Sequence, residues 1–361
     1  MANIILKNLY KSFDDFVAVK GSDLVIENGE FFVLLGPSGC GKTTTLRMIA
    51  GLEIPTSGQI LLDGDDVTFS RASKRDIAFV FQLFALYPHM NVWKNLAFPL
   101  KMQKMNAPDI KKRVMEVAKL LQIEHLIKAK VSGLAGGDRQ RVALGRAIVR
   151  RPKAFLMDEP LGTLDAEFRE QMSIELKKLH NRINATTVYV THDQIEAMTM
   201  GDKVAVMNEG KILQFGTPNE IYSKPATKFV GSFIGAPSMN FIPFESEVHE
   251  GDTEVLVDGQ KLQIPRQRDN SLSPKNFIGV RPENMKLNTE KGIRGTVYGT
   301  EYLGNRKICT IDTKAGQLKV RITKDQSVSI NDPVQVSFPP EAAILFNGQS
   351  EKALMSDQIT N

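Results

Sequence analysis

The chain has 361 residues, of which 42% are hydrophobic and 24% are charged, and its formal net charge is +5. This composition is typical of a globular protein and excludes a disordered chain, a collagen or a disulfide-stabilised scaffold. At about 150 residues per domain, the length predicts two domains. No apolar run approaches the roughly 18–20 residues needed to cross a bilayer, and the start of the chain lacks an apolar signal segment. Its two cysteines, Cys40 and Cys309, are too few for a disulfide framework, so we expect a soluble protein of the reducing cytoplasm.

Positive charge is concentrated in the first part of the chain. Residues 236–361 hold 15 Lys+Arg and 16 Asp+Glu, a net charge of −1, which leaves +6 for residues 1–235. A mild basic excess suits an anionic partner, such as a nucleotide, a nucleic acid or a membrane surface. Charge alone does not choose among these partners.

Strand-like and helix-like patterns alternate over residues 1–235. Short apolar runs, typical of buried parallel strands, occupy 31–35, 77–81, 154–157, 187–190 and 204–207. Between them, apolar residues recur every three or four positions in 109–121 and in 166–183, which predicts helices there. Because strands alternate with helices, we expect an α/β domain built on a largely parallel sheet.

The pattern of apolar and polar residues changes after Pro237. Short alternating stretches at 254–257, 295–298 and 318–322 are separated by turn residues, and helical periodicity disappears. Many short strands at this spacing predict a small all-β domain, a barrel or a sandwich. We therefore place the domain boundary near residue 235, which gives domains of 1–235 and 236–361.

A glycine-rich loop follows the first predicted strand of the α/β domain. It matches the pattern G-x-x-x-x-G-K-[ST] and comprises Gly36, Pro37, Ser38, Gly39, Cys40, Gly41, Lys42 and Thr43. Its glycines let backbone N–H groups face a phosphate, and the helix predicted over 44–50 adds positive potential. Lys42 is expected to reach the β- and γ-phosphates, and the Thr43 hydroxyl to ligate Mg²⁺. We interpret Cys40 as a small residue that fits the loop.

Two carboxylates end the strand predicted at 154–157. Charges at this end of a parallel strand lie at the edge of the sheet where ligands bind. Asp158 is expected to hold Mg²⁺ through water, and Glu159 to orient and polarise the attacking water.

These motifs, and four more in the same order, resemble those of the nucleotide-binding subunits of ABC transporters. The signature motif of that family resembles Leu134, Ala135, Gly136, Gly137 and Asp138. Gln82 resembles the Q-loop glutamine, Asp165 the D-loop aspartate and His192 the switch histidine. Phe13 lies where the family places an aromatic residue that stacks on adenine. The resemblance implies a P-loop ATPase domain with a helical subdomain, followed by an OB-like all-β domain.

The resemblance also implies a mechanism of ATP hydrolysis. Two such domains pair head to tail, and each ATP lies between the phosphate loop of one and the signature loop of the other. A helix beginning near Asp138 then presents N–H donors to the γ-phosphate. His192 contacts that phosphate and Glu159, Gln82 touches Mg²⁺ and the attacking water, and Asp165 acts across the dimer interface. The implied ATP contacts are Phe13, residues 36–43, Thr44, Gln82 and His192, and the implied Mg²⁺ ligands are Thr43, Gln82 and Asp158.

The signature departs from the family pattern at two positions. Ala135 replaces the usual serine and Asp138 the usual glutamine, while 162–163 read Gly-Thr where Ser-Asn is common. The missing hydroxyl removes one donor to the γ-phosphate, and a hydrogen bond to a charged group contributes about 1.5–3 kcal/mol. Two readings remain open: a heterodimer with a subunit whose signature is intact, or a homodimer that tolerates the change.

Several segments resemble sugar importers of the maltose and glycerol-phosphate type. Residues 84–101 resemble the segment that receives a coupling helix from a membrane subunit, and 229–243 the end of the ATPase domain. Residues 279–283 and 301–305 resemble the accessory β-domain. The resemblance implies an ATPase for a bacterial importer of a sugar, polyol or glycerol-type solute. It would lie on the cytoplasmic face of the membrane, with two permease subunits and a separate solute-binding protein as partners and no nucleic acid. The alternatives are a soluble ABC ATPase of translation or DNA repair and an importer of polyamines or anions.

Overall fold

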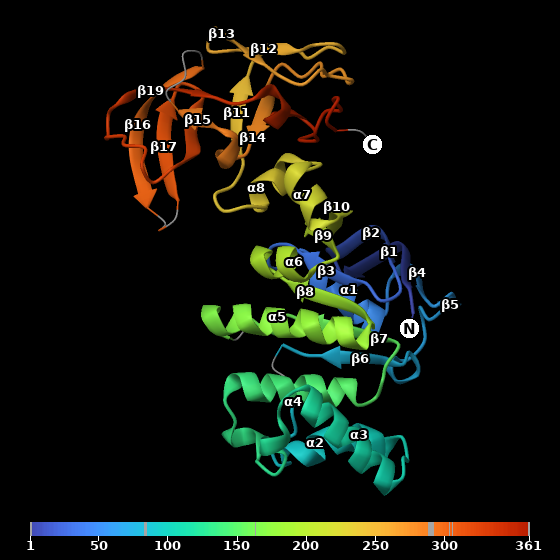
Figure 1. Cartoon of the computed structure of the whole chain (residues 1–361). Helices are drawn as coiled ribbons and strands as arrows, with labels where there is room; N and C mark the ends of the chain where they lie inside the picture. Colours follow the sequence, from blue (N-terminus) through green and yellow to red (C-terminus); the bar gives the residue numbers. More distant parts are fainter. Residues whose placement is uncertain are drawn as a thin grey trace. The chain divides into compact units, whose positions relative to one another are not determined.

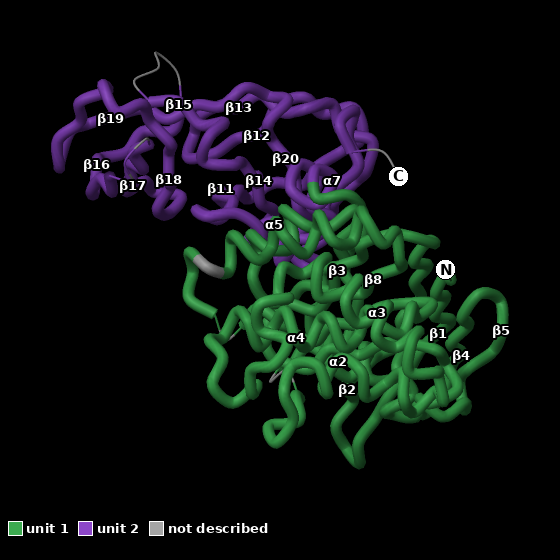
Figure 2. The backbone as a smooth tube through the Cα atoms, turned by 60° about the horizontal axis from the view of Figure 1, so that its bottom comes forward, with its two compact units in different colours: residues 1–218 green, residues 219–361 purple. Residues whose placement is uncertain are grey.

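The structure is a computed structural model that describes residues 2–82, 85–162, 164–287, 292–302, 304 and 306–359. The chain divides into two compact units, residues 1–218 and 219–361, which are coloured separately in Figure 2. Each unit has its own hydrophobic cluster of buried side chains. Two domains are what the chain length predicts.

A six-stranded sheet forms the centre of the first unit, in the order β10-β9-β3-β8-β7-β6. Its strands are β3 (Phe31–Leu35), β6 (Ile77–Val80), β7 (Ala154–Asp158), β8 (Thr186–Thr191), β9 (Lys203–Asn208) and β10 (Lys211–Gly216). All neighbours run parallel except β9 and β10, which pair antiparallel. Every residue of β3, β7 and β8 is buried, as expected for parallel strands covered on both faces. The predicted α/β architecture is confirmed.

A second sheet, which the apolar runs did not reveal, precedes and follows the phosphate loop in the chain. It is antiparallel, in the order β2-β1-β4-β5. Its strands are β1 (Ile4–Phe13), β2 (Phe16–Ile26), β4 (Ser57–Leu62) and β5 (Asp65–Asp66). Buried residues of this sheet, such as Leu6, share one hydrophobic cluster with Leu46 of the first helix and Leu34 of β3. The first helix is therefore packed into a core built from both sheets.

Six helices of the described residues belong to the first unit. They are α1 (Lys42–Ala50), α2 (Val92–Met102), α3 (Ala107–Leu120), α4 (Gly136–Ile148), α5 (Ala166–Ile183) and α6 (Gln194–Met200). Figure 1 shows α2, α3 and α4 grouped together, apart from α1 and α6. Helix α2 packs on both α3 and α4. This group is the predicted helical subdomain.

The second unit is mainly β-structure. Strands β11 (Asn240–Phe244), β14 (Asn276–Val280) and β20 (Ile344–Asn347) form one sheet, and β12 (Glu254–Val257) pairs with β13 (Gln260–Gln263). A five-stranded antiparallel sheet contains β15 (Lys286–Leu287), β16 (Ile293–Tyr302), β17 (Lys307–Thr313), β18 (Gly316–Ile322) and β19 (Pro333–Ser337). Short 3₁₀ turns in the two units lie at Ala72–Lys74, Glu124–Leu126, Val131–Gly133, Pro282–Asn284 and Pro340–Ala342. The predicted OB-like all-β domain is confirmed.

The two units divide between Pro218 and Asn219, earlier than the boundary expected near residue 235. The intervening residues form α7 (Pro218–Ser223) and α8 (Lys228–Phe233), which belong mainly to the second unit. Arg281 accounts for the place of these helices in the second unit. It is 3% exposed, and its guanidinium donates to the backbone oxygens of Tyr222, Gly231 and Ile234. A buried cation with several acceptors fixes these helices to the β-structure.

Within the described part of the chain, no helix combines the length and the apolar character that crossing a membrane requires.

Candidate nucleotide-binding site

The phosphate loop joins β3 to α1 in a turn that only glycine fits at two positions. A Cβ on Gly36 would lie 2.3 Å from the backbone oxygen of Met207 and 2.8 Å from Sγ of Cys40. Gly41 has φ of +104°, and a Cβ there would lie 2.4 Å from the backbone oxygen of Ala18. The loop is therefore pressed against β9 and β2, and its shape depends on these two glycines.

Lys42 folds back over the phosphate loop. Its Nζ donates to the backbone oxygens of Gly36 at 2.8 Å and of Pro37 at 2.9 Å, and the residue is 4% exposed. Nζ also lies 3.8 Å from Sγ of Cys40, whose thiol is buried and has its pKa raised by that burial. A raised pKa disfavours the reactive thiolate, which agrees with a packing role for Cys40. The ammonium is thus held at the centre of the loop, where a phosphate would meet it.

Helix α1 supplies further N–H donors at the same place. Its N-cap is Gly41, which offers no side-chain acceptor to the first turn. The first N–H groups of a helix have no intrahelical partner, and they carry positive potential. The first turn of α1, which contains Thr43 and Thr44, therefore points an anion-binding end into the phosphate loop.

Thr43 and Asp158 come together although 115 positions separate them. The Thr43 hydroxyl donates to Oδ1 of Asp158 at 2.9 Å. Asp158 ends β7 and is 8% exposed, and burial raises the pKa of its carboxyl, against the lowering effects of the Thr43 bond and of nearby Arg47. A hydroxyl and a desolvated carboxylate side by side are the oxygen ligands that Mg²⁺ prefers. The residues present therefore fit a divalent cation bound with nucleotide.

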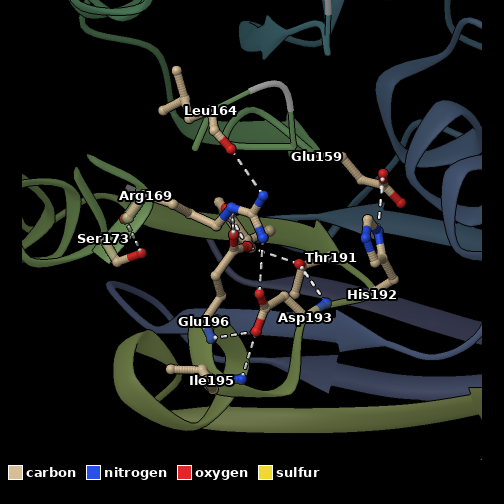
Figure 3. Close-up of polar contacts among 10 residues, drawn as sticks. Glu159, Leu164, Arg169, Ser173, Thr191, His192, Asp193, Ile195 and Glu196 are labelled. Atoms are coloured by element: carbon tan, nitrogen blue, oxygen red, sulfur yellow. Dashed lines mark hydrogen bonds and ion pairs between the residues drawn. The ribbon is translucent and has the colours of Figure 1, made fainter. Parts of the chain in front are cut away.

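Glu159 and His192 face one another at the carboxyl ends of β7 and β8 (Figure 3). Nδ1 of His192 lies 3.2 Å from Oε2 of Glu159, and their side chains are 52% and 19% exposed. Glu159 has φ of +44°, and its N–H donates to the backbone oxygen of Val190 at 3.1 Å. A non-glycine residue at positive φ is uncommon and often marks a functional site. The pairing expected from the sequence is present.

Gln82 and the D-loop lie beside this pair. Gly162 lies between Gln82 and Glu159. A Cβ built on Gly162 would lie 3.8 Å from Nε2 of Gln82 and 3.4 Å from the backbone oxygen of Glu159. Gly162 N–H donates to the same oxygen at 3.1 Å. The exposed Gln82 is therefore near Glu159. Thr163 of the D-loop lies outside the described residues.

The signature residues form the start of α4. Ala135 is the N-cap, with a β-region backbone and no side-chain hydrogen bond, so the helix begins at Gly136, two positions before Asp138. Gly136 and Gly137 therefore contribute first-turn N–H groups, as the predicted role requires. A Cβ on Gly136 would contact Leu164 at 3.5 Å, which places the signature beside the D-loop.

One chain does not bring its own signature to its own phosphate loop. Figure 1 shows α4 on one side of α5 and β6, and α1 on the other side. The signature helix α4 and the phosphate-loop helix α1 therefore lie apart within one chain.

Phe13 ends β1 at the tip of the β1–β2 hairpin and is 42% exposed. Nζ of Lys11 lies 4.5 Å from the centre of its ring. An exposed aromatic ring on the sheet that also contacts Gly41 suits a base-stacking role.

Comparison with known proteins places these motifs in a family. The family model described as "ABC transporter" matches residues 19–162, and the one described as "TOBE domain" matches residues 278–346. The sn-glycerol-3-phosphate import ATP-binding protein UgpC of Bordetella avium is 45% identical, over 93% of this chain and 94% of its own length. The chain is an ABC transporter ATP-binding protein.

Two further comparisons support this assignment. The trehalose/maltose import ATP-binding protein MalK of Thermococcus litoralis is 43% identical over 98% of this chain and 100% of its own length. A solved structure described as the dimeric structure of MJ0796, a bacterial ABC transporter cassette, is 33% identical with a TM-score of 0.54. It covers 60% of this chain and 98% of that one. As an ABC-type ATPase, the chain binds nucleotide and hydrolyses ATP.

The ABC ATPase structure also contains a polar network that sequence reasoning missed (Figure 3). Arg169 of α5 donates to the backbone oxygen of Leu164 at 2.9 Å and pairs with Asp193 at 3.1 Å. Asp193 is the N-cap of α6, accepting from the N–H groups of Ile195 and Glu196. A sequence signal existed, because Asp193-Gln194-Ile195-Glu196 fits the pattern of a helix N-terminus.

Glu196 anchors the base of this network. Its Oε2 accepts from the hydroxyls of Tyr189 at 2.8 Å and Thr191 at 2.7 Å, and the residue is 5% exposed. Burial raises the pKa of the Glu196 carboxyl, opposed by the Thr191 and Tyr189 hydrogen bonds. The switch segment that carries His192 is therefore fixed to β8 on one side and to α6 on the other.

The segment expected to receive a coupling helix is held from within the ABC ATPase unit. Asn95, fully buried in α2, accepts from the N–H of Tyr87 at 3.0 Å and donates to its backbone oxygen at 3.2 Å. Arg146 of α4 donates to the backbone oxygen of Ala85 at 2.8 Å. Phe84, the first residue of this segment, lies outside the described residues.

Proposed function

We propose that this chain powers a bacterial importer of a sugar, polyol or glycerol-type solute by hydrolysing ATP with the residues identified above. The observation that carries the site assignment is the pairing of His192 with Glu159 beside the Thr43–Asp158 contact. The cargo class is supported by relatives that are named for import of sn-glycerol-3-phosphate and of trehalose and maltose.

Each residue of the site has a role that its geometry supports. Lys42 and the N–H groups of the loop bind the β- and γ-phosphates. Glu159 holds the attacking water and polarises it, because its carboxylate is partly exposed at the edge of the sheet. His192 contacts the γ-phosphate while its Nδ1 orients Glu159. Gln82 is close enough to Glu159 to sense the same water.

Mg²⁺ is the proposed cofactor, held by Thr43 with Asp158 and Gln82. When bound, it neutralises charge on the β- and γ-phosphate oxygens. The Thr43–Asp158 contact supports this assignment, since two oxygen ligands are already adjacent.

A second ATPase subunit completes each site. The separation of α4 from α1 within one chain supports a head-to-tail pair, in which Gly136 and Gly137 serve ATP bound by the partner. Asp165, the D-loop aspartate, directly precedes α5 and would act across that interface. ATPase assays of the purified chain, alone and mixed with a paralogous subunit, distinguish a homodimer from a heterodimer. Full activity of the chain alone, unaffected by Ala135→Ser, would exclude the heterodimer.

Two permease subunits and a separate solute-binding protein are the proposed partners, and the chain would lie on the cytoplasmic face of the membrane. The segment that Asn95 and Arg146 hold in place supports the permease contact, because its backbone is fixed at Ala85 and Tyr87, a few positions after Gln82 in the chain.

Affinity purification of the full chain from detergent-solubilised cells tests this assignment. Co-purification of integral membrane proteins is expected, and co-purification of ribosomes or DNA would overturn it. In vesicles that contain the purified complex, ATPase activity should rise when the solute-binding protein and its sugar, polyol or glycerol-type ligand are added. Stimulation only by a polyamine or an inorganic anion would refute the cargo class.

A further inference from the structure

Arg169 joins two segments that the ATPase mechanism treats separately (Figure 3). Its Nη2 donates to the backbone oxygen of Leu164 at 2.9 Å, and its Nη1 lies 3.1 Å from Oδ2 of Asp193. Leu164 belongs to the D-loop, and Asp193 directly follows His192. We propose that Arg169 is a positioning residue that sets the location of His192 according to the position of the D-loop.

The backbone of Arg169 is itself anchored to the D-loop end of α5. Its N–H donates to the backbone oxygen of Asp165 at 2.9 Å, and its own carbonyl accepts from the Ser173 hydroxyl at 2.9 Å. A displacement of Leu164 and Asp165 would therefore carry both the backbone and the guanidinium of Arg169 with it.

At the other end of this connection, the carboxylate of Asp193 both caps α6 and pairs with Arg169. Its Oδ1 caps α6 by accepting from Ile195 N–H at 2.7 Å, while its Oδ2 pairs with Arg169. Its N–H donates to the Thr191 hydroxyl at 3.0 Å. These contacts fix the carboxylate of Asp193 and the peptide that joins it to His192, so a displacement of Arg169 would be passed to His192 through Asp193.

A planar guanidinium suits this task better than an ammonium. It presents donors in fixed directions, so that one cation can bind the Leu164 oxygen and the Asp193 carboxylate at once. Among the described residues, Nε of Arg169 is buried without a hydrogen-bond partner, and it lies 3.8 Å from Oε1 of Glu196. This second carboxylate attracts the cation electrostatically and helps to hold it between Leu164 and Asp193.

This inference rests on the proposed catalytic role of His192. In the head-to-tail pair proposed above, the D-loop would face the partner subunit. Binding of the partner would then move Leu164 and, through Arg169 and Asp193, His192. The hydrolytic pair of Glu159 and His192 would then be aligned only when the dimer is closed.

Steady-state kinetics of the purified full chain test the connection. Arg169→Gln is expected to lower kcat about tenfold, which corresponds to the loss of one hydrogen bond to a charged group, while KM for ATP stays unchanged. Arg169→Lys should recover activity only in part, since one ammonium cannot hold both acceptors in the same geometry. Equal losses for Arg169→Gln and a matched control would overturn the proposal.

Lys177→Gln is that control. Lys177 lies on the same helix and pairs with Asp202 at 2.6 Å with a similar exposed fraction, 24% against 27% for Arg169. It touches neither the D-loop nor the switch segment in the described contacts, so kcat should not change.

Asp193→Asn tests the other end of the bond and is available if Arg169→Gln does not fold. Asparagine also caps helices, so the α6 N-cap should survive the substitution. The double variant should lose no more kcat than either single variant, because both remove the same connection. Additive losses would contradict the proposal.

A spectroscopic readout separates this inference from the catalytic role of His192. The chain has five histidines, and the Hε1 resonance of His192 can be assigned by its loss in His192→Gln. Arg169→Gln should shift this resonance and leave those of His89, His125 and His249 in place. A shifted His192 resonance with unchanged kcat would refute the role of His192 in hydrolysis but support the connection between Arg169 and His192. An unshifted resonance would refute the connection itself.

Discussion

Nδ1 of His192 lies 3.2 Å from Oε2 of Glu159, at the ends of two neighbouring parallel strands. The pair is assembled by the fold, since 33 positions separate the residues in the chain. Glu159 is held there by a backbone at φ of +44° and by a hydrogen bond to Val190. The arrangement places a carboxylate where a water attacking the γ-phosphate would be polarised.

Glu159→Gln should abolish turnover but not ATP binding. The amide has the shape of the carboxylate and can keep a contact with His192, but it cannot accept a proton. We expect kcat to fall by about 10²–10⁴-fold, the usual contribution of a general base. Fluorescent ATP-analogue titration should show an unchanged dissociation constant. A kcat within about threefold of wild type would assign the base to another residue.

Ala135→Ser should stabilise the ATPase unit. Ala135 occupies the N-cap of α4 with a backbone in the extended region, and its exposed side chain leaves room for a hydroxyl. A serine there would accept a hydrogen bond from the first turn, which typically contributes about 1 kcal/mol. The measurement is the midpoint of urea unfolding, with Ala135→Val as a control that cannot cap. An unchanged midpoint for the serine variant would show that the N-cap is already satisfied.

Stability should fall as the pH falls below the ordinary histidine value of 6.5, in part because of His180. This residue is 8% exposed, and its Nδ1 forms a hydrogen bond of 3.0 Å with the Thr187 hydroxyl. Burial lowers the pKa of its imidazole, and the nearby charge of Lys177 lowers it further. The unfolded chain therefore binds a proton that the folded chain resists, so protonation favours unfolding. Above 6.5 the imidazole is neutral in both states and the effect vanishes.

Urea unfolding at pH 8 and at pH 5.5 gives the change in the free energy of unfolding with pH, for the wild type and for His180→Gln. All other side chains are the same in the two proteins, so the difference between them reports the effect of His180. The wild type should lose more free energy of unfolding between the two pH values than the variant. Parallel losses would mean that the imidazole is protonated in the folded state as readily as in the unfolded one.

Arg281→Met should release α7 and α8 from the second unit. The guanidinium is buried and satisfies the backbone oxygens of Tyr222, Gly231 and Ile234. Its removal leaves buried acceptors without donors, which costs about 1–3 kcal/mol for each group. Amide hydrogen exchange in residues 219–234 should accelerate by at least about tenfold.

Arg268→Met is the matched control in the same unit. Arg268 pairs instead with an acidic side chain, that of Asp357 at 2.8 Å, and its own side chain is 54% exposed. Exposed ion pairs contribute about 0–1 kcal/mol, so exchange in 219–234 should not change. If both variants accelerate exchange equally, Arg281 has no special role in holding these helices.

Local sequence patterns by themselves determine much of this protein. The strand at 31–35 and the helix at 166–183 have the bounds that their patterns predict, because uninterrupted apolar runs and strong 3.6-residue periodicity report burial directly. The phosphate loop is equally local, since its function depends on glycines and a lysine at fixed spacing. For the same reason, the sequence alone reveals the missing hydroxyl at Ala135.

Only the tertiary structure decided the rest, because those features depend on contacts between distant residues. The sheet of β1, β2, β4 and β5 escapes the sequence patterns since its strands are half buried and carry polar residues between apolar ones, a weaker signal than a fully buried run. The unit boundary lies at 218 because Arg281 binds carbonyls some 50 positions earlier. In the sequence, Arg169 is an ordinary charge on a solvated helix. Its contacts with Leu164 and Asp193 are visible only in the folded chain, since the neighbours of a residue in the sequence do not reveal which distant residues its side chain meets.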